Sequence, residues 1–345
     1  MRRRTFLTAL GAAGTWALTG CRSGSGAPAA ESYVPDPGAL QVYSSQHQNV
    51  TRAWADAFTA ATGVAVQIRQ GQDASMGHQI VAEGTSSPAD VFLTENSPAM
   101  TLVERAGLLA GVDAATRRQV PTTAAPSSGA WTGIAARSTV LVYNKAALPE
   151  QDLPASLMDL ARPEWKQRWA CAAGGADFQS IVAGMLAGQG EARTSAWLDG
   201  LKVNAQVLQN NIATMKAVNA GELPCGVIFH YYWYRDQAGS KEGSGNTALH
   251  YFRRQDPGAF VSLSAGGVLA SAKKADVAQQ FLAFITGKQG QQVLVDSGSM
   301  EYAVGRGVAS DPALPTLASL QAPPVDPFSL DSEKVIALMT GTGIL

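Results

Sequence analysis

The sequence has few charged residues and no long apolar run in its body. Asp, Glu, Lys and Arg make up 15% of the 345 residues, against about 25% in an average soluble domain. The formal net charge of −1 argues against a general affinity for nucleic acid. Beyond the N-terminus, no stretch approaches the ~20 apolar residues of a membrane-spanning helix. We therefore expect a soluble globular protein of about two domains, with enough chain for a sizeable core.

Short motifs of several enzyme classes are also missing. The sequence has no His-Glu-x-x-His, no Gly-x-Ser-x-Gly, no P-loop and no Gly-x-Gly-x-x-Gly. Its four histidines are His47, His78, His230 and His250, and for His78 and His250 we expect surface or packing roles. These absences do not exclude an enzyme, but they lower the expectation of one.

Residues 1–21 have the layout of an export signal. Arg2-Arg3-Arg4 precedes an apolar run that ends at Leu18-Thr19-Gly20-Cys21, and this run is too short to span a membrane comfortably. The last four residues resemble a lipoprotein cleavage box in which Cys21 is lipidated; the alternative is an ordinary signal peptide with an incidental cysteine. The arginines favour the twin-arginine export route, although arginine-rich starts also serve the general route. Cleavage before Cys21 would lower the net charge to −4.

Residues 22–38 are small, polar and proline-containing, and we interpret them as a flexible tether between a lipid and the folded part. Two further cysteines, Cys171 and Cys225, lie beyond this tether. An oxidising compartment would allow them to pair. Two buried free thiols are an equally good interpretation.

Strands and helices alternate in the first part of the folded chain. The residue pattern predicts strands at 40–43, 64–68 and 89–93, with helices between them. This order is typical of a parallel sheet that helices cover on both faces. His47 and Glu95 come just after the first and third strands, at the ends where open α/β sheets bind their ligands.

A second set of strands and helices follows a long run of strand-forming residues. That run spans 131–143 and is long enough to cross between two domains, and residues 260–263 are predicted to cross back. Strands are predicted between the two crossings at 169–171 and 226–229, and an amphipathic helix at 275–286. We expect the following lobes: lobe 1 from 39–139 plus 262–312, and lobe 2 from 140–261 plus 313–345.

Tyr231 and Tyr232 stand out because they directly follow a predicted strand and begin a helix-compatible stretch. In a first helical turn, consecutive side chains diverge by about 100°, so both hydroxyls could reach one atom. A phenol has a pKa of about 10 and loses its proton readily only beside a strong positive charge. Two phenolates, the carboxylate of Glu95 and the imidazole of His47 would suit the small, hard Fe³⁺ ion. Aromatic packing or a sugar-stacking platform is the alternative interpretation of the pair.

Four segments resemble one protein family and occur in its order: Val42-Tyr43-Ser44-Ser45-Gln46-His47, Ser87-Pro88-Ala89-Asp90-Val91-Phe92-Leu93-Thr94-Glu95, Tyr231-Tyr232-Trp233-Tyr234 and Gln255-Asp256-Pro257-Gly258-Ala259. From about residue 40 to about residue 310, the chain is similar to the periplasmic ferric-iron-binding proteins of ABC importers. The resemblance implies the α/β fold of type II periplasmic binding proteins. In that fold, two lobes, each a mostly parallel sheet flanked by helices, are joined by hinge strands. The resemblance also implies a protein that is not an enzyme.

The resemblance further implies where the bound ion lies. The metal ligands of the family fall here on His47, Glu95, Tyr231 and Tyr232. The ion would be Fe³⁺, held with a synergistic anion such as phosphate, carbonate or citrate, and N–H groups at the start of a helix suit such an anion. The residues expected around the anion are Gly174, Gly175, Ala176, Asn211, His230, Arg137 and Asn96.

Two positions depart from the family pattern or complicate it. His230 stands where asparagine is frequent, and it is interpreted as an anion donor, a fifth ligand or a packed histidine. Asp177 adds a negative charge beside the expected anion turn. For Arg137 a structural or solvated role, and for Asn96 a cap on the following turn, are the alternatives to an anion contact.

The implied function is capture and delivery. Fe³⁺ with its anion would meet the tyrosines on one lobe and then His47 and Glu95 on the other, and hinge closure would complete the site. The loaded protein, a lipid-anchored monomer outside the cytoplasm, would dock on an ABC permease. The same fold could instead hold a phosphonate, thiamine, polyamine or sugar. An exported metal-dependent hydrolase and a module that feeds a sensor are the remaining alternatives.

Overall fold

The computed structural model describes residues 33–345, except the side chain of Phe328. The predicted signal peptide, its cleavage box with Cys21 and residues 22–32 of the predicted tether lie outside the described residues. Within residues 33–345, no helix has the length and apolar character needed to cross a membrane.

The first sheet has the strand order β2-β1-β3-β9-β4. Its strands are β1 (Leu40–Ser44), β2 (Val66–Gln70), β3 (Val91–Thr94), β4 (Trp131–Asn144) and β9 (Val261–Val268). β1 pairs in parallel with β2 and β3, whereas β9 runs antiparallel to β3 and β4. The parallel pairs form because a helix returns the chain to the start of the sheet after each strand. These connecting helices are α1 (Gln48–Thr62) and α2 (Asp73–Glu83).

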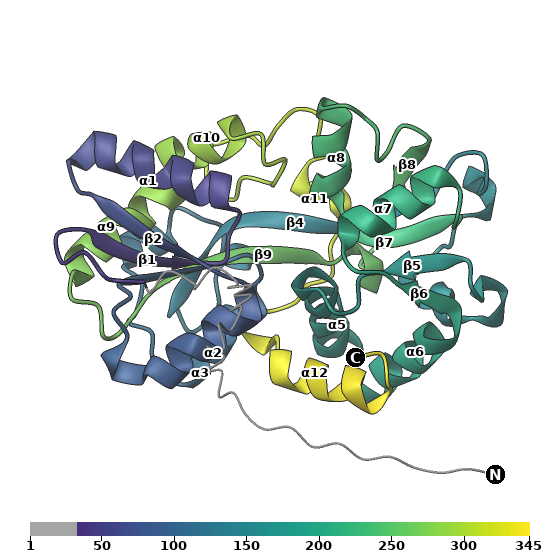
Figure 1. Ribbon diagram of the computed structural model, residues 1–345, viewed down its shortest axis with the longest axis horizontal. Helices are drawn as coiled ribbons and strands as arrows, with labels where there is room; N and C mark the ends of the chain where they lie inside the picture. Colours follow the sequence, from purple (N-terminus) through teal and green to yellow (C-terminus); the bar gives the residue numbers. More distant parts are fainter. Residues whose placement is uncertain (1–32) are drawn as a thin grey trace, which may run out of the picture. The chain divides into compact units, whose positions relative to one another are not determined.

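Helices cover both faces of the first sheet (Figure 1). On one face, α1 packs with α9 (Ala275–Thr286) and α10 (Lys288–Asp296), and Trp54 and Phe58 of α1 share a cluster with Phe281 of α9. On the other face lie α2 and α3 (Ser97–Arg105). The amphipathic helix predicted at 275–286 is confirmed with its bounds.

β4 continues into a second sheet, in which it pairs with β7 (Cys225–Phe229) and β8 (Thr247–His250). β7 is followed across this sheet by β5 (Trp169–Cys171) and β6 (Ala205–Val207). Neighbouring side chains of a strand point to opposite faces, so Leu141 and Val142 of β4 enter two different apolar clusters. The remaining helices of eight or more residues are α5 (Ala176–Gln189), α6 (Glu191–Asn204), α7 (Asn211–Ala220), α8 (His230–Ala238) and α12 (Ser332–Gly341).

Short helices connect these elements. The two short α-helices are α4 (Ala114–Arg117) and α11 (Leu317–Leu320). The 3₁₀ turns are η1 (Gly84–Ser86), η2 (Thr122–Ala124), η3 (Glu150–Asp152), η4 (Leu157–Ala161), η5 (Pro163–Trp165), η6 (Pro257–Ala259) and η7 (Pro327–Ser329).

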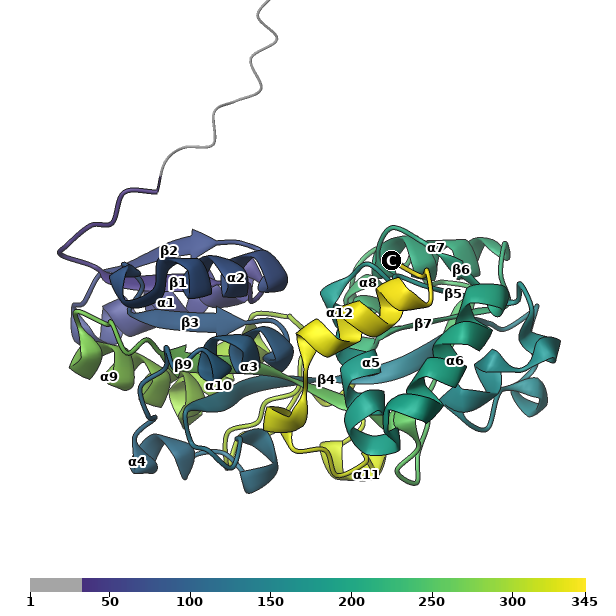
Figure 2. The same ribbon diagram turned by 90° about the horizontal axis from the view of Figure 1, so that it is seen from below.

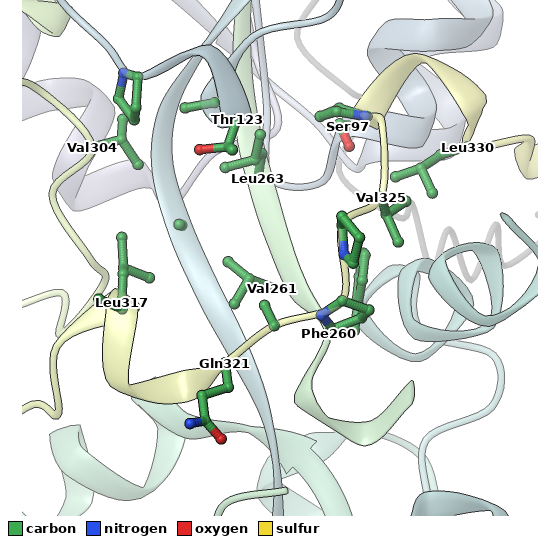
Figure 3. Close-up of a pocket in the computed structure, with 18 residues that line it drawn as sticks. Ser97, Thr123, Phe260, Val261, Leu263, Val304, Leu317, Gln321, Val325 and Leu330 are labelled. Carbon is green, nitrogen blue, oxygen red and sulfur yellow. The ribbon is translucent and has the colours of Figure 1, made fainter. Parts of the chain in front are cut away.

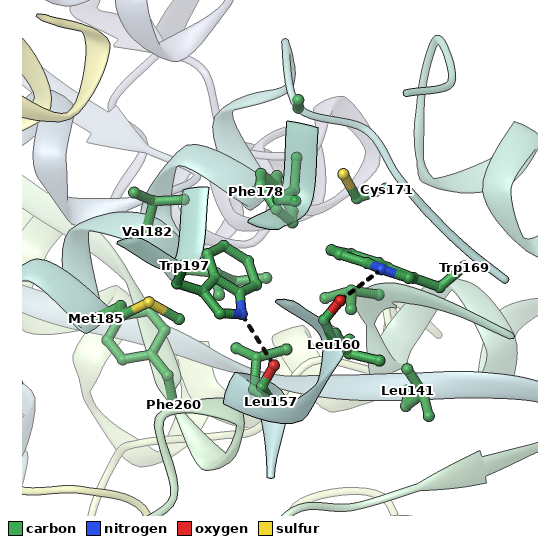
Figure 4. Packing of buried hydrophobic residues seen from close by; sticks show 14 of the residues in the cluster. Leu141, Leu157, Leu160, Trp169, Cys171, Phe178, Val182, Met185, Trp197 and Phe260 are labelled. Carbon is green, nitrogen blue, oxygen red and sulfur yellow. Dashed lines mark hydrogen bonds between the residues drawn. The ribbon is translucent and has the colours of Figure 1, made fainter. Parts of the chain in front are cut away.

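The core beneath the second sheet is built around tryptophans (Figure 4). Trp169 and Trp197 are buried, and the ring of Phe178 stacks on Trp197 at 6.1 Å between centroids. The two indole N–H groups donate to the carbonyl oxygens of Leu160 and Leu157, at 3.1 and 3.0 Å. Because a buried indole N–H needs an acceptor, these bonds fix η4 against the core. The buried tryptophans therefore fix the position of β5, the strand that leads to α5.

β4 and β9 lie side by side (Figures 1 and 2), and β4 continues from the first sheet into the second. The pairing of the two strands extends from Trp131 opposite Gly267 to Ser138 opposite Val261. The crossing strand predicted at 131–143 is confirmed as β4. The return predicted at 260–263 overlaps the start of β9, which among the described strands pairs only with β3 and β4 of the first sheet. Parallel pairing holds for β2-β1-β3 and for β7-β5-β6, but the crossing strands pair antiparallel because the chain returns along them. Each sheet is therefore mixed. The division into lobes at residues 139/140 and 261/262 remains a prediction about which parts move.

A cavity of about 430 Å³ lies between the crossing strands and the C-terminal segment (Figure 3). Its wall is largely apolar and includes Val261 and Leu263 of β9, Val304, Leu317 and Val325. None of the predicted site residues lines it. A charged solute would find few partners there.

Cys171 and Cys225 are free thiols, and both are buried. Burial raises the pKa of each thiol above its ordinary value. Of the two interpretations from the sequence, the structure supports two packed thiols on the neighbouring strands β5 and β7.

Candidate metal-binding site

His47 and Glu95 meet because β1 and β3 are parallel neighbours. Both strands end at the same edge of the first sheet, and His47 precedes α1 while Glu95 directly follows β3. The Nε2 atom of His47 lies 3.6 Å from Oε1 of Glu95, and each side chain is about one-fifth exposed, at 20% and 19%. The expected placement of these two residues at the carboxyl ends of the strands is what the structure shows.

Tyr231 and Tyr232 occupy the first turn of α8, directly after β7. Their ring centroids lie 4.1 Å apart, so no ligand ring fits between them. Tyr231 is fully buried and donates to Oε1 of Glu95 at 3.1 Å. This contact joins α8, on the second sheet, to the end of β3, on the first. The tandem tyrosines thus meet the histidine–glutamate pair, and their two rings leave no space for a sugar between them.

Asp177 is the member of the site that the sequence reasoning missed. Its Oδ2 atom accepts hydrogen bonds from the hydroxyls of Tyr231 and Tyr232, at 3.3 and 3.1 Å. Asp177 lies in the first turn of α5, and its side chain is 5% exposed. Its position could have indicated it, because Asp177 is the second residue of the helix that follows β5 and therefore lies beyond a strand end, as Glu95 does. The sequence reasoning had treated its charge only as a complication for an anion.

Two of the residues predicted to hold an anion, Asn211 and Asn96, contact this carboxylate instead. Asn211 donates from Nδ2 to Oδ2 of Asp177 at 2.8 Å. Gly174, Gly175 and Ala176 form the turn into α5, but the N–H of Gly175 donates to the carbonyl of Ala172 at 2.9 Å. That N–H is therefore already used within the turn. The position expected for an exogenous anion lies next to a negative charge of the protein itself.

Asn96 connects the two sheets at the site. It stands at the N-cap position of α3, yet its side chain makes no capping hydrogen bond. Its Nδ2 donates to Oδ1 of Asp177 at 3.0 Å, and its Oδ1 accepts from Oγ of Ser262 at 2.8 Å. The side chain thus orients Asp177 rather than capping the helix, which was the alternative considered from the sequence.

Arg137 lies within β4 and is completely buried. Its guanidinium donates to the backbone carbonyl of Glu95 and to Oε1 of Gln46, the latter at 2.8 Å, and forms an ion pair with Glu301. It also lies over the ring of Tyr231 at 5.5 Å from the centroid. Arg137 therefore supplies positive charge behind the site, on the side of Glu95 and Glu301, and none of its polar contacts is with the Gly174–Ala176 turn.

His230 packs in the wall behind the tyrosines. Its Nδ1 accepts from the backbone N–H of Ser138 at 3.2 Å, and its ring stacks on Tyr302 at 4.6 Å between centroids. His78 and His250 lie outside the site: His250 is in β8, and His78 is in α2, where it lines a small cavity with Ala176. His47 contacts both Glu95 and the ring of Tyr231, whereas His230 touches the ring of Tyr231 from behind.

Burial determines the protonation of the site. It raises the pKa of Tyr231, Tyr232 and Glu95 above their ordinary values, and the negative charge of Asp177 adds to each shift. Burial, followed by the charge of Arg137, lowers the pKa of His47 to about 3. At neutral pH the site therefore holds two neutral phenols, which become phenolates only when a strongly positive ion replaces their protons.

The arrangement brings together one imidazole nitrogen, two carboxylates and two phenols. Hard cations of high charge prefer such oxygen-rich donor sets, while soft metals prefer thiolates. Among residues 33–345, no three His, Cys, Asp or Glu side chains are arranged to hold a metal by themselves, so tyrosine oxygens are needed to complete this site. The chemistry that fits is binding of a hard trivalent ion.

Comparison with known proteins gives a consistent result. A family model described as bacterial extracellular solute-binding protein matches residues 86–328. The chain is 54% identical over 306 residues to the Fe(3+)-binding periplasmic protein of Serratia marcescens, covering 89% of this chain and 90% of that protein. It is 35% identical over 297 residues to the major ferric iron-binding protein of Neisseria meningitidis serogroup B, covering 86% and 89%.

Solved structures show the same architecture. The structure of iron-bound HitA from Pseudomonas aeruginosa has a TM-score of 0.83 and 39% identity, and the match covers 89% of this chain and 100% of that one. A Trichodesmium protein named IdiA or FutA, in complex with iron and citrate ligands, has a TM-score of 0.78 and 27% identity, covering 89% and 99%.

Proposed function

The chain belongs to the bacterial extracellular solute-binding protein family, and on this premise we propose that it captures ferric iron outside the cytoplasm and delivers it to an ABC permease. The observation that carries the proposal is the convergence of the Tyr231 and Tyr232 hydroxyls on Glu95 and Asp177. The names of the relatives support the same ion, since they are described as ferric-iron-binding proteins. We assign no catalytic residue.

The proposed ligands are His47, Glu95, Tyr231, Tyr232 and Asp177. The two phenolates and two carboxylates would bring four negative charges to an ion of charge +3, and His47 adds a neutral nitrogen. Divalent ions would offset less of this charge and displace the phenol protons less easily. The donor set therefore favours Fe³⁺ over common divalent metals.

Asp177 is proposed to take the place of a synergistic anion. Its carboxylate already accepts hydrogen bonds from both tyrosine hydroxyls and from Asn211. The five side chains supply at least five donor atoms, and a further anion would add negative charge to a site that already exceeds the charge of the ion. Phosphate, carbonate or citrate would then be dispensable, unlike in the scheme inferred from the resemblance.

Capture is proposed to proceed by closure. The tyrosines and Asp177 belong to helices on the second sheet, whereas His47 and Glu95 belong to the first. Since all five donors meet only when the two sheets approach, the ion stabilises the closed form over an open one. β4 is the natural hinge because it pairs in both sheets, and β9 begins beside it, with Val261 opposite Ser138.

The cellular setting remains a proposal drawn from the sequence. Export by a twin-arginine or general signal, lipidation of Cys21, a monomeric state and a cognate ABC permease fit a solute-binding protein that must stay near its transporter. Lipid attachment would hold the protein at the membrane by an acyl chain rather than by a helix.

Metal selectivity measured on the purified chain tests the proposed function. The protein is dialysed against ferric nitrilotriacetate, Zn²⁺ or Mn²⁺ in buffer free of phosphate, carbonate and citrate, and native mass spectrometry then records the bound mass. We expect a bound mass equal to one Fe³⁺ per chain, with no additional mass from nitrilotriacetate or another anion. Equal retention of zinc, or no retention of iron, would contradict the proposal.

A further inference from the structure

Asp73 is a buried carboxylate that has no part in the proposed ion binding. It is the first residue of α2 and is 5% exposed. Its Oδ1 accepts the backbone N–H of Glu95 at 2.8 Å, and its Oδ2 accepts the backbone N–H of Asn96 at 2.8 Å. Its Oδ1 also accepts the hydroxyl of Ser45. One carboxylate therefore binds the N–H groups before and after the Cα atom of Glu95.

These bonds join the two segments that carry the histidine and the glutamate. Ser45 follows β1 and lies two residues before His47, and its N–H donates to the carbonyl of Leu93 in β3 at 2.8 Å. Asp73 thus connects the end of β1 to the end of β3 from a third element, α2. Buried charge-assisted bonds of this kind are stronger than neutral ones and fix geometry closely.

We propose that Asp73 is a positioning residue that sets the direction of the Glu95 carboxylate toward the ion, an inference that rests on the proposed ferric function. Asp73 acts through backbone N–H groups and touches no ion. Residues that orient a metal ligand in this way typically alter metal affinity by about 10- to 100-fold when replaced.

Asp90 provides a matched control in the same part of the fold. It is 1% exposed, and its carboxylate accepts the backbone N–H groups of Gln41, Lys273 and Lys274 at 2.9, 2.8 and 3.0 Å. It precedes β3, whereas Asp73 bonds to residues that follow it. The two carboxylates have similar burial and similar partners, but only one of them holds the Glu95 segment.

The substitution Asp73→Asn replaces one acceptor by an NH₂ group that faces a backbone N–H. The test measures ferric affinity of the full chain by competition with citrate, together with the thermal midpoint. We expect Asp73→Asn to weaken iron binding about 10- to 100-fold, while Asp90→Asn lowers the thermal midpoint and leaves the affinity within about 3-fold of the wild type. At saturating iron, both variants should keep the visible tyrosinate absorption, because the phenolates come from α8.

A double-mutant cycle separates positioning from general stability. If Asp73 acts through Glu95, the Asp73→Asn change should cost less than about 3-fold in a Glu95→Gln background. An equal loss in both backgrounds, or an affinity of Asp73→Asn within 3-fold of the wild type, would overturn the proposal.

A variant that fails to fold and a wild type that fails to bind iron are distinguished as follows. If Asp73→Asn does not fold, Ser45→Ala removes one donor to the same carboxylate and should weaken iron binding about 5-fold; unchanged affinity in that variant would also overturn the proposal. A wild-type chain that binds no ferric iron would defeat the proposed function, and this inference with it. A wild type that binds iron, with no coupling between Asp73 and Glu95, would defeat the inference alone.

Discussion

At the proposed ferric site, each donor type meets a separate requirement of the ion. Tyr231 and Tyr232 offer oxygens that become anionic only against a strong charge, because burial raises their pKa values. His47 offers a nitrogen that stays neutral, because its pKa is lowered to about 3. The combination is selective for a highly charged ion, since a weaker one would not displace the phenol protons.

Replacing Tyr232 by Phe removes one of these oxygens and keeps the ring. We expect Tyr232→Phe to weaken ferric binding by at least about 100-fold, since a ligand and its charge are lost together. Tyr234→Phe is the matched control, because Tyr234 lies on the same helix and its hydroxyl pairs with Tyr251 at 3.2 Å. Competition with citrate measures both variants, and similar affinities for the two would argue against the tyrosine ligand.

Removing the carboxylate of Asp177 should make iron binding depend on an added anion. Asp177→Ala removes the acceptor of the Tyr232 hydroxyl and of the Asn211 and Asn96 amides, and leaves Tyr231 with Glu95 as its acceptor. We expect phosphate or citrate to raise the ferric affinity of this variant about 10-fold or more, and that of the wild type very little, because charged acceptors bind such donors strongly. Asp199→Ala, at an exposed position of α6, controls for the loss of charge. A wild type that itself requires an anion would contradict the proposed role of Asp177.

Ferric binding should release protons and weaken as the pH falls. The raised pKa values keep Tyr231 and Tyr232 protonated in the iron-free protein between pH 5 and 8, whereas His47 is neutral there. Iron replaces both phenol protons, so the affinity should rise at least about 100-fold per pH unit, and more where Glu95, whose pKa is also raised, gives up a proton. Weakly buffered titration, corrected for a protein-free blank, should record at least two protons per iron and one fewer for Tyr232→Phe. The same release in both proteins would contradict the phenolate assignment.

Among the elements, α12 reaches toward both parts of the fold. Val335 and Met339 belong to the core cluster of the second sheet, while Asp331, at its N-cap, pairs with Arg105 of α3 at 2.6 Å. The Oδ1 atom of Asp331 also accepts the N–H of Lys334 at 2.9 Å. The carboxylate of Asp331 therefore both caps α12 and pairs with Arg105.

The cap should matter more than the ion pair. Asp331→Ala is expected to lower the free energy of unfolding by about 1 kcal/mol, whereas Arg105→Ala, which keeps the cap, should cost about 0.5 kcal/mol or less, since exposed pairs contribute little. Urea unfolding followed by tryptophan fluorescence measures both variants. Equal losses would indicate that the ion pair, and not the cap, controls this helix.

The order of helices and strands could be predicted from the sequence, but the side-chain contacts between distant elements could be predicted only in part. Local periodicity was enough for the crossing strand β4 and for α9. Glu95 and the tyrosine pair were marked by their position after strands and by the resemblance. The pairing of Arg137 with Glu301 could not be predicted, because it joins residues 164 positions apart through a turn with no local signature. Asp177 was seen as a charge, but its partners come from three other elements.

In the whole molecule, one ion is proposed to join the two sheets. Tyr231 bonds to Glu95, Asn96 bonds to Asp177, and the ring of His47 contacts that of Tyr231, so these links between the sheets involve proposed ligands or their direct partners. An ion bound here would hold the two parts together and favour the closed form by its differential affinity. Release to a permease would then require the parts to separate.

A visible absorption titration of the purified chain with ferric nitrilotriacetate tests this account most directly. Iron bound to phenolate absorbs visible light, whereas gallium bound at the same ligands does not. The account predicts a broad band that saturates at one iron per chain, disappears with excess chelator and is absent with Ga³⁺. A colourless protein that retains iron, or a band unchanged in the Tyr231→Phe, Tyr232→Phe double variant, would contradict it.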